Sequence, residues 1–162
     1  MIAQVLDRTL GCFRVGDPRG AYPVFSAMGS TIEPGRWNEV NSAMIYACEH
    51  FSTALLEKLA HGGGVMPPHQ HFVRITIPRG ASYEVLSPPS LPGWDEPKPV
   101  ASKAFGVRWC RERRSLVLIV PSVVARLDRN IIINPAHPEF AQIATSLHEP
   151  LFWDRRLFEA RP

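Results

Sequence analysis

The sequence concentrates several chemically useful side chains in one short segment, Pro34-Gly35-Arg36-Trp37-Asn38. Gly35 permits a tight turn, and Arg36 then offers a planar fork of donors that suits a phosphate or a carboxylate. Trp37 adds a flat stacking surface, while Asn38 can both donate and accept hydrogen bonds. These residue types favour an anionic ligand with an aromatic part, but a turn that only buries its tryptophan explains them equally well.

Four further residues could take part in chemistry, although each also has an ordinary structural explanation. Tyr46 lies in a short apolar run and could be a core residue, while Glu57 falls on the polar side of an expected helix and could simply be solvated. Ser122 follows an apolar run in Val-Pro-Ser and could be a turn residue or a helix cap. Arg14, in Phe-Arg-Val, could be a surface arginine. Residue types alone therefore leave the roles of these four side chains open.

The elements that must position these residues are mostly short strands. Residues 71–78 place Val, Ile and Ile at alternate positions, which predicts a strand with one buried face. Apolar, β-rich runs predict further strands at 43–48, 116–120 and 131–133, and residues 151–158 could form a last strand. These strands predict a mixed domain built around a mostly antiparallel sheet.

Two helices are expected between the strands. Ser52 could cap a helix over residues 53–61, where three leucines share one face. Ser102 could cap a second helix over residues 102–114, although Gly106 weakens that segment. Glu57 would then project from the polar side of the first helix.

The composition fits one folded domain. The chain has 162 residues, of which 45% are hydrophobic and 20% charged, and a domain usually has about 100–200 residues. No run approaches the ~18 apolar residues that a membrane span needs. Cys12, Cys48 and Cys110 are far apart, so they predict reduced thiols rather than a disulfide framework. We therefore expect a cytoplasmic protein that does not associate with a membrane.

Several common kinds of active site lack support in the sequence. The chain contains neither G-x-G-x-x-G nor a P-loop, the two commonest glycine cradles for phosphates. It also lacks the G-x-S-x-G elbow of many hydrolases. His69 and His71 are two residues apart but have no third ligand nearby, so we expect no metal site.

The basic segment from Arg108 to Arg114 suggests a function of another class. Its sequence, Arg-Trp-Cys-Arg-Glu-Arg-Arg, interleaves arginines with an aromatic residue, as in some nucleic-acid binding modules. The net charge of +3 is too weak to support that function on its own. A solvated helix face explains the same residues, and we favour that interpretation.

Six short segments, taken in chain order, resemble the RES domain, a family named for its arginine, glutamate and serine. The resemblance spans nearly the whole chain, and the terminal Phe-Trp-Asp-Arg-Arg-Leu also looks like the family's ending. Two departures lie beside the arginine turn, where Pro34 replaces a commoner glycine and Glu39-Val40 replaces a small turn. The six segments are Phe-Arg-Val at Arg14, Gly-Arg-Trp-Asn at Arg36, Ile-Tyr-Ala at Tyr46, Ala-Leu-Leu-Glu at Glu57, Val-Pro-Ser at Ser122, and Ile-Asn-Pro-Ala-His-Pro over 133–138.

The resemblance implies a single RES domain over residues 1–162 that acts as the toxin of a bacterial toxin–antitoxin pair and consumes NAD⁺. It implies an α+β fold like that of ADP-ribosyltransferases of the diphtheria-toxin type, with a mostly antiparallel β core and short flanking helices. It also implies a protein partner, an Xre-like antitoxin that covers the active site. Contact with nucleic acid would then be indirect, through that antitoxin.

The resemblance places the site at Arg14, Arg36, Tyr46, Glu57 and Ser122, and NAD⁺ chemistry suits these residue types. Cleavage passes through an oxocarbenium-like transition state, which the Glu57 carboxylate would stabilise. Arg14 and Arg36 would hold the pyrophosphate, and Tyr46 would stack on the nicotinamide. Ser122 would hydrogen-bond the nicotinamide amide or a ribose. We expect Glu57 and Arg36 to be catalytic and the others, with Arg36, to bind the substrate.

The acceptor of the ADP-ribose stays open at this stage. A protein side chain is favoured, whereas water or inorganic phosphate would make the protein an NAD⁺ glycohydrolase or phosphorylase that depletes cellular NAD⁺. A catalytically inactive domain that only sequesters a partner is a further alternative. Residues 87–99 hold five prolines and read as a long loop, which we regard as a candidate element facing the acceptor.

Overall fold

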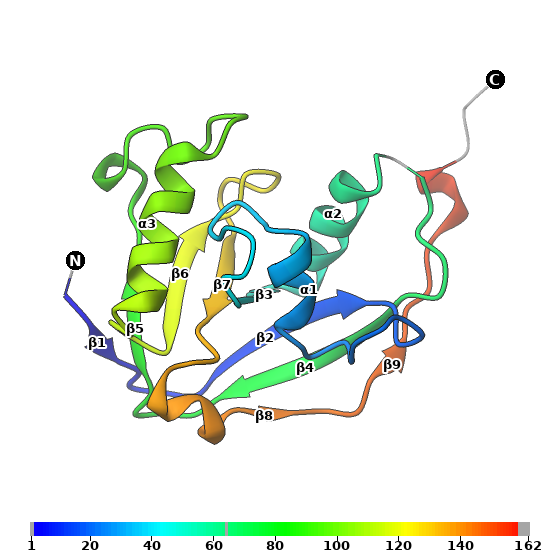
Figure 1. Cartoon of the computed structure of the whole chain (residues 1–162). Coiled ribbons are helices and arrows are strands. Elements are labelled where there is room, and N and C mark those ends of the chain that lie inside the picture. The colour runs from blue at the N-terminus through cyan, green and yellow to red at the C-terminus, as the bar shows by residue number, and fades with distance from the viewer. Residues whose placement is uncertain (1, 64, 159–162) are drawn as a thin grey trace.

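One large mixed sheet dominates the computed structural model, which describes residues 2–63 and 65–158 (Figure 1). Its strands follow the order β1-β5-β6-β7-β3-β2-β4-β8, and β9 pairs with β4. Only β5 and β6 run parallel among the described pairs. The expected α+β class with a mostly antiparallel sheet is therefore confirmed. The strands are β1 (Gln4–Val5), β2 (Leu10–Gly16), β3 (Ile45–Cys48), β4 (His71–Ile77), β5 (Ser82–Val85), β6 (Val117–Pro121), β7 (Arg129–Ile133), β8 (Ala144–Thr145) and β9 (Glu149–Pro150).

The helices are short and leave much of the chain in turns and loops. Helix α2 packs on β2 and β3, and α3 lies beside β5 and β6 (Figure 1). None of the helices in the described residues has both the length and the apolar character that crossing a bilayer requires. The α-helices are α1 (Met28–Ile32), α2 (Phe51–His61) and α3 (Val100–Arg111), and the 3₁₀ helices are η1 (Pro88–Ser90), η2 (Pro138–Gln142) and η3 (Arg155–Leu157).

The central strands β6 and β7 separate two hydrophobic cores. Successive side chains of a strand point to opposite faces, so Ile131 and Ile133 enter one core while Ile132 enters the other. The second core lies under α3, where Trp109 is completely buried against Leu118 and its neighbours. Because both faces of these strands are covered, their sequences are continuous aliphatic runs rather than alternating ones.

Several predicted boundaries were wrong for identifiable reasons. Helix α2 begins at Phe51 after His50, so Ser52 lies inside the helix and does not cap it. Ser102 is likewise internal to α3, where its buried hydroxyl donates to the Trp94 carbonyl at 2.6 Å. Residues 151–158 form no strand but end in η3. Ser102 is thus used by the tertiary structure, whereas Ser52 is an exposed residue of the first helical turn.

The inner face of α2 also differs from the prediction. Its buried residues are Thr53 and Ala54, whereas Leu56 is 46% exposed. Glu57 lies four residues after Thr53 and three after Ala54, so it shares their face of the helix. The leucine pattern predicted that Glu57 faces bulk solvent, and this prediction was wrong.

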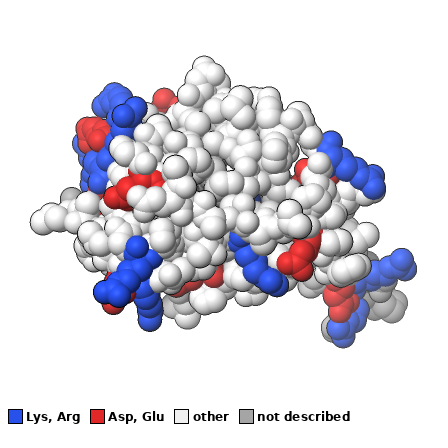
Figure 2. All heavy atoms as spheres, turned by 90° about the horizontal axis from the view of Figure 1, so that it is seen from below, with Lys and Arg blue, Asp and Glu red and all other residues white. Residues whose placement is uncertain are grey.

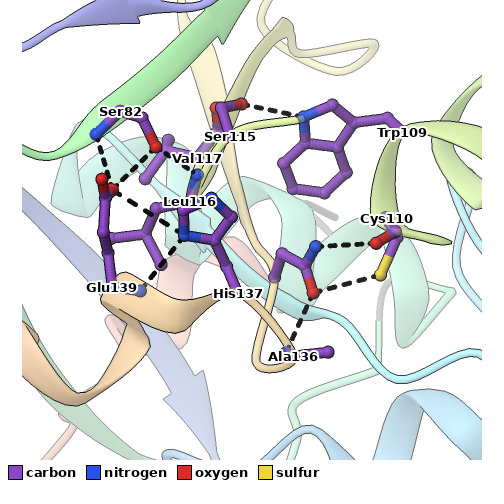
Figure 3. A network of polar contacts seen from close by, with 10 residues as sticks. Ser82, Trp109, Cys110, Ser115, Leu116, Val117, Ala136, His137 and Glu139 are labelled. Carbon is purple, nitrogen blue, oxygen red and sulfur yellow. Dashed lines mark hydrogen bonds and ion pairs between the residues drawn. The ribbon is translucent and has the colours of Figure 1, made fainter. Parts of the chain in front are cut away.

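The basic segment 108–114 is divided between core and surface. The Trp109 indole donates to the Ser115 hydroxyl at 2.9 Å inside the core (Figure 3). Arg114 makes a two-pronged ion pair with Glu84, a carboxylate that is only 1% exposed. The fold thus uses two residues of the proposed nucleic-acid patch, and the exposed arginines that remain are Arg108, Arg111 and Arg113.

The face of the molecule seen from below also argues against a nucleic-acid surface there. Figure 2 shows that blue and red side chains alternate around the rim of this face, while its middle is uncharged. A nucleic-acid interface instead concentrates basic groups on one face or stripe. Among the described residues drawn on this face, no such stripe is present.

The motif at residues 133–138 has a structural role. The Asn134 amide donates to the Cys110 carbonyl at 2.9 Å, and its oxygen accepts from the Cys110 thiol at 3.3 Å. Nearby, the Glu139 carboxylate accepts from both the amide and the hydroxyl of Ser82, at 2.8 and 2.7 Å (Figure 3). These bonds join the end of α3 to the segment after β7, and that segment to β5.

Gly106 explains how α3 can approach the arginine turn. A Cβ at position 106 would lie 2.1 Å from the carbonyl oxygen of Trp37, far inside contact distance. The glycine that weakens the helix in isolation is therefore required where the helix passes over the turn.

Gly106→Ala should destabilise the protein, although alanine normally favours a helix over glycine by about 1 kcal/mol. Overlap with the Trp37 carbonyl forces α3 or the turn to move, which costs about 1–3 kcal/mol. Urea unfolding followed by circular dichroism measures this change. Gly11→Ala is the control, because nothing lies within 4 Å of a Cβ there. An unchanged midpoint for Gly106→Ala would contradict the close packing.

Candidate functional site

A cleft of about 730 Å³ opens between the arginine turn, strands β2 and β3, helix α2 and the turn that joins β6 to β7. Arg14, Arg36, Tyr46 and Glu57 all line it. Ser122 is completely buried and hydrogen-bonds Glu57. The fold thus brings the five predicted residues, which lie far apart in the sequence, around one cavity.

Arg14 on β2 is a half-buried cation held by the backbone. Its Nε donates to the carbonyl of Val24 at 2.6 Å, and its two Nη atoms donate to those of Tyr46 and Ser26, at 2.8 and 3.3 Å. Burial lowers the pKa of Arg14, yet an arginine stays charged in proteins. It forms no ion pair with any carboxylate in the described residues. An anion in the cleft would supply the missing counter-charge.

Tyr46 and Asn38 lock the arginine turn in place. Asn38 is fully buried, and its oxygen accepts from the Tyr46 hydroxyl and the Gly35 amide, each at 2.7 Å. The hydroxyl in turn accepts from the Trp37 amide at 3.0 Å. Burial raises the pKa of Tyr46, so the phenol stays protonated. Its hydroxyl is therefore committed to the turn, and its ring borders the cleft.

Gly35 is needed for this arrangement. A Cβ at position 35 would lie 2.6 Å from Cζ of Tyr46, so only a residue without a side chain can pass this close to the ring. The expected tight turn is present, and its glycine packs on a tyrosine that follows it on the next strand.

Arg36 connects the turn to the proline-rich loop. Its Nη1 donates to the carbonyls of Trp94 and Glu96, at 3.2 and 2.7 Å. Among the described residues of loop 87–99, Pro99 alone lines the cleft. The loop therefore contacts the site mainly through Arg36, which fixes the guanidinium at the cleft wall.

Glu57 is positioned by two donors on the same oxygen. The Ser122 hydroxyl donates to Oε1 at 2.9 Å, and the Asn130 side-chain amide donates to it at 2.5 Å. Ser122 has only one hydroxyl proton, and this proton is directed at Glu57. The serine that we expected to contact a ligand instead orients the carboxylate. Two donors on one oxygen fix the side chain and leave Oε2 available to the cleft.

Asn130 is the site residue that sequence reasoning missed. It lies on β7, one position before the predicted strand 131–133, and pairs with Val120 on β6. Its own oxygen is buried and has no partner, which is rare for a buried polar atom. A hairpin between the two predicted aliphatic strands would have placed residue 130 near Ser122, and this was the available signal.

A second set of contacts fixes the base of α2. The Asp128 carboxylate accepts from the Thr53 hydroxyl and lies 3.4 Å from Nδ1 of His50. The Asp128 carbonyl accepts from the Ser122 amide at 3.0 Å. A negative group at a helix N-terminus is favourable. One turn between β6 and β7 thus holds both the start of α2 and the carboxylate in its middle.

Cys48 lines the cleft as a buried thiol. Burial, reinforced by the negative charge of Glu57, raises the pKa of its thiol to about 12. The reactive form of cysteine is the thiolate, which is scarce at neutral pH under these conditions. Glu57 is therefore the group in this part of the cleft with the charge to interact with a cationic centre.

The charges on the cleft wall are mostly positive. Arg14 and Arg36 lie at separate positions and two lysines add to them, whereas two carboxylates of the described residues line the same space. Such a wall concentrates anionic ligands. The charged lining residues are Arg14, Arg36, Lys58, Lys103, Glu33 and Glu57.

The two histidines considered as a metal pair have separate contacts. Nε2 of His69 lies 3.1 Å from Nη1 of Arg19, while Nδ1 of His71 lies 2.9 Å from Nδ1 of His148. Within residues 2–63 and 65–158, no group of three or more histidine, cysteine, aspartate or glutamate side chains is arranged to hold a metal ion.

Comparison with known proteins places these features in context. The chain is 39% identical over 137 residues to the Prs ADP-ribosylating toxin of Sphingobium sp. (strain YBL2), covering 82% of this chain and 85% of that protein. It is 32% identical over 141 residues to Toxin Res of Pseudomonas putida, covering 85% and 95%. Toxin Res of Yersinia enterocolitica is 29% identical over 150 residues, covering 90% and 97%.

A solved structure shares the fold. A chain of the M. tuberculosis MbcT–MbcA toxin–antitoxin complex superposes with a TM-score of 0.72 at 14% identity, covering 91% of this chain and 86% of that chain. The family model described as the RES domain matches residues 12–154, a range that contains every predicted site residue. The chain therefore belongs to the RES domain family.

Proposed function

We propose that this protein is the toxin of a toxin–antitoxin pair and that it cleaves NAD⁺ and transfers the ADP-ribose to an acceptor. The observation that carries the proposal is Glu57, a carboxylate held by Ser122 and Asn130 at a cleft whose Arg14 guanidinium has no carboxylate partner within residues 2–63 and 65–158. The relative named as an ADP-ribosylating toxin supports the same chemistry. A protein antitoxin that covers this cleft, of the Xre-like type, is part of the proposal. We place the reaction in the cytoplasm, where NAD⁺ is available.

The residues present fit a dinucleotide with a cationic ring and an anionic centre. The pyrophosphate would accept hydrogen bonds from Arg14, which has used three of its five N–H groups. Arg36 would supply a second cation at the turn, and the ring of Tyr46 would form a wall for the nicotinamide. Asn130 would act through Glu57, because its side-chain amide donates to the carboxylate while its own oxygen is buried.

The chemical step breaks the bond between the ribose C1′ and the nicotinamide nitrogen. The bonding electrons leave with nicotinamide, which departs as a neutral molecule, and the ribose becomes oxocarbenium-like. Glu57 would stabilise that positive charge and accept a hydrogen bond from a ribose hydroxyl through Oε2. An acceptor nucleophile then bonds to C1′ and loses its proton. Ser122 acts through Glu57, as a positioning residue.

We favour a protein side chain as the acceptor, with water and inorganic phosphate as the alternatives. The deciding experiment incubates the purified protein with NAD⁺, with and without phosphate and cell lysate, and follows the products by mass spectrometry. A mass increase of one ADP-ribose on a lysate protein supports transfer to protein. Free ADP-ribose or ADP-ribose 1″-phosphate identifies the alternatives, and intact NAD⁺ under every condition would refute the proposal.

Glu57→Gln should keep the fold and nearly abolish nicotinamide release. Glutamine can still accept from Ser122 and Asn130, but it lacks the negative charge, so about 2–4 kcal/mol of transition-state stabilisation is lost. This corresponds to a rate lower by roughly 30–900-fold. Chromatographic assay of nicotinamide measures the rate, and near wild-type turnover would exclude Glu57 from the chemistry.

Ser122→Ala and Asn130→Ala should each lower kcat by roughly tenfold to a hundredfold, because each removes a hydrogen bond to a charged group worth about 1.5–3 kcal/mol. The effects should not add in the double variant, since both donors orient the same oxygen. KM for NAD⁺ should change much less than kcat. Ser90→Ala, an exposed serine in η1, is the matched control, and additive losses would mean that the two residues act independently.

Tyr46→Phe removes the hydroxyl and keeps the ring, so it tests the two roles of Tyr46 separately. The ring stays at the cleft, but the Trp37 amide loses its acceptor and Asn38 loses a donor, so the free energy of unfolding should fall by about 1–3 kcal/mol. Thermal or urea unfolding tests this directly. A fully stable variant would show that the turn does not depend on the phenol.

A further inference from the structure

Lys58 lies beside the candidate catalytic carboxylate and has no assigned role. It follows Glu57 on α2, is half-buried, and lines the same cleft as Arg14. It makes no ion pair with a carboxylate in the part of the chain that the structure describes. A lysine on a surface helix ordinarily extends its ammonium into bulk water. Lys58 instead lines a cleft and is half-buried, and this placement requires an explanation.

The electrostatic surroundings of Lys58 point to an anion. Burial lowers the pKa of its ammonium, and the positive charge of Arg14 lowers it further, with Asp17 and Glu33 acting in the opposite direction. Two neighbouring cations that share a partly buried wall repel each other. An anion placed between them would relieve this repulsion and return part of the solvation that both groups lose on burial.

A second cavity adjoins this wall. It has a volume of about 170 Å³ and shares Arg14, Gly16 and Gly29 with the main cleft. A ligand with an anionic centre and a group on either side could therefore rest its centre near Arg14 and extend into both cavities. A dinucleotide has this shape, with its pyrophosphate in the middle.

We propose that Lys58 and Arg14 together form a pyrophosphate subsite, in which the Lys58 ammonium contacts the phosphate oxygens of NAD⁺. The assignment of NAD⁺ rests on the proposed function, whereas the subsite itself requires only a pyrophosphate. The two cations have different roles in this subsite. Arg14 is fixed by backbone carbonyls and presents N–H groups in a rigid geometry, while Lys58 is a mobile point charge that can follow the ligand.

The test compares Lys58→Gln and Lys58→Arg with Lys98→Gln, a matched substitution at an exposed lysine outside the cleft. Calorimetry measures the binding of ADP-ribose, inorganic pyrophosphate and adenosine to each full-length variant. Lys58→Gln should weaken ADP-ribose and pyrophosphate binding by about tenfold or more, because a charge-assisted hydrogen bond is lost. Lys58→Arg should restore most of the affinity, and Lys98→Gln should match the wild type.

Two further readouts separate phosphate binding from a structural role. Adenosine carries no phosphate, so its affinity should be the same in all four proteins, and so should the thermal unfolding midpoint. KM for NAD⁺ should rise in Lys58→Gln while kcat stays nearly constant. The affinity of the wild type for ADP-ribose should also fall more steeply with added salt than that of Lys58→Gln.

Each outcome decides between the proposals. If the wild type binds pyrophosphate and ADP-ribose, and Lys58→Gln binds them equally well, the subsite is wrong and the proposed function stands. If Lys58 governs pyrophosphate binding but NAD⁺ is never cleaved, the subsite stands and the proposed function fails. If the wild type binds neither ligand, both fail. A loss of kcat with unchanged affinity would assign Lys58 to the chemistry and refute its role at the phosphate.

Discussion

The arrangement of the whole site depends on holding one half-buried positive charge, that of Arg14, without a negative partner among the described residues. Arg14 meets this constraint through three backbone carbonyls, contributed by β3 and by the segment before α1. Carbonyl oxygens solvate a guanidinium but do not neutralise it, so the cleft keeps a net attraction for anions. A carboxylate partner would have compensated the charge of Arg14 in the folded protein, and it would have made the cleft less able to bind a phosphate.

Glu57 is a negative charge that is held, like the positive charge of Arg14, by uncharged hydrogen-bonding groups. The β6–β7 connection contributes Ser122 and Asp128, and β7 contributes Asn130; these residues contact α2 at its first turn and at Glu57. The carboxylate is therefore oriented by a hairpin whose strands contribute Leu118, Ile119, Val120, Ile131, Ile132 and Ile133 to the two cores. Because the supporting residues lie on strands and a tight turn rather than on a free loop, the geometry of the carboxylate is set before any ligand arrives.

The sequence predicted several core strands, but it did not predict the inner face of α2 or the helix starts. The alternation in 71–78 and the aliphatic runs at 116–120 and 131–133 identified three core strands because strand burial leaves a local pattern. The face of α2 could not be found this way, since its inner surface is built from Thr53, Ala54 and Glu57, which are small or polar. Ser52 and Ser102 looked like caps because capping is judged locally, but both helices begin earlier, and Ser102 bonds the Trp94 carbonyl instead. The site itself could be assembled only through the family resemblance, which supplied the order of segments that lie far apart in sequence.

The residues that escaped prediction share a physical reason. Asn130 and Lys58 have no motif of their own, and their significance comes from what they lack among the described residues: an acceptor atom without a donor, and a cation without a carboxylate. A sequence shows residue types, but an unmet interaction exists only after the chain has folded. A half-buried lysine that lines the cleft without a carboxylate partner among the described residues can pair with an anionic ligand instead. Lys58 lies next to Glu57, where the substrate of an ADP-ribosyl transfer would have to bind.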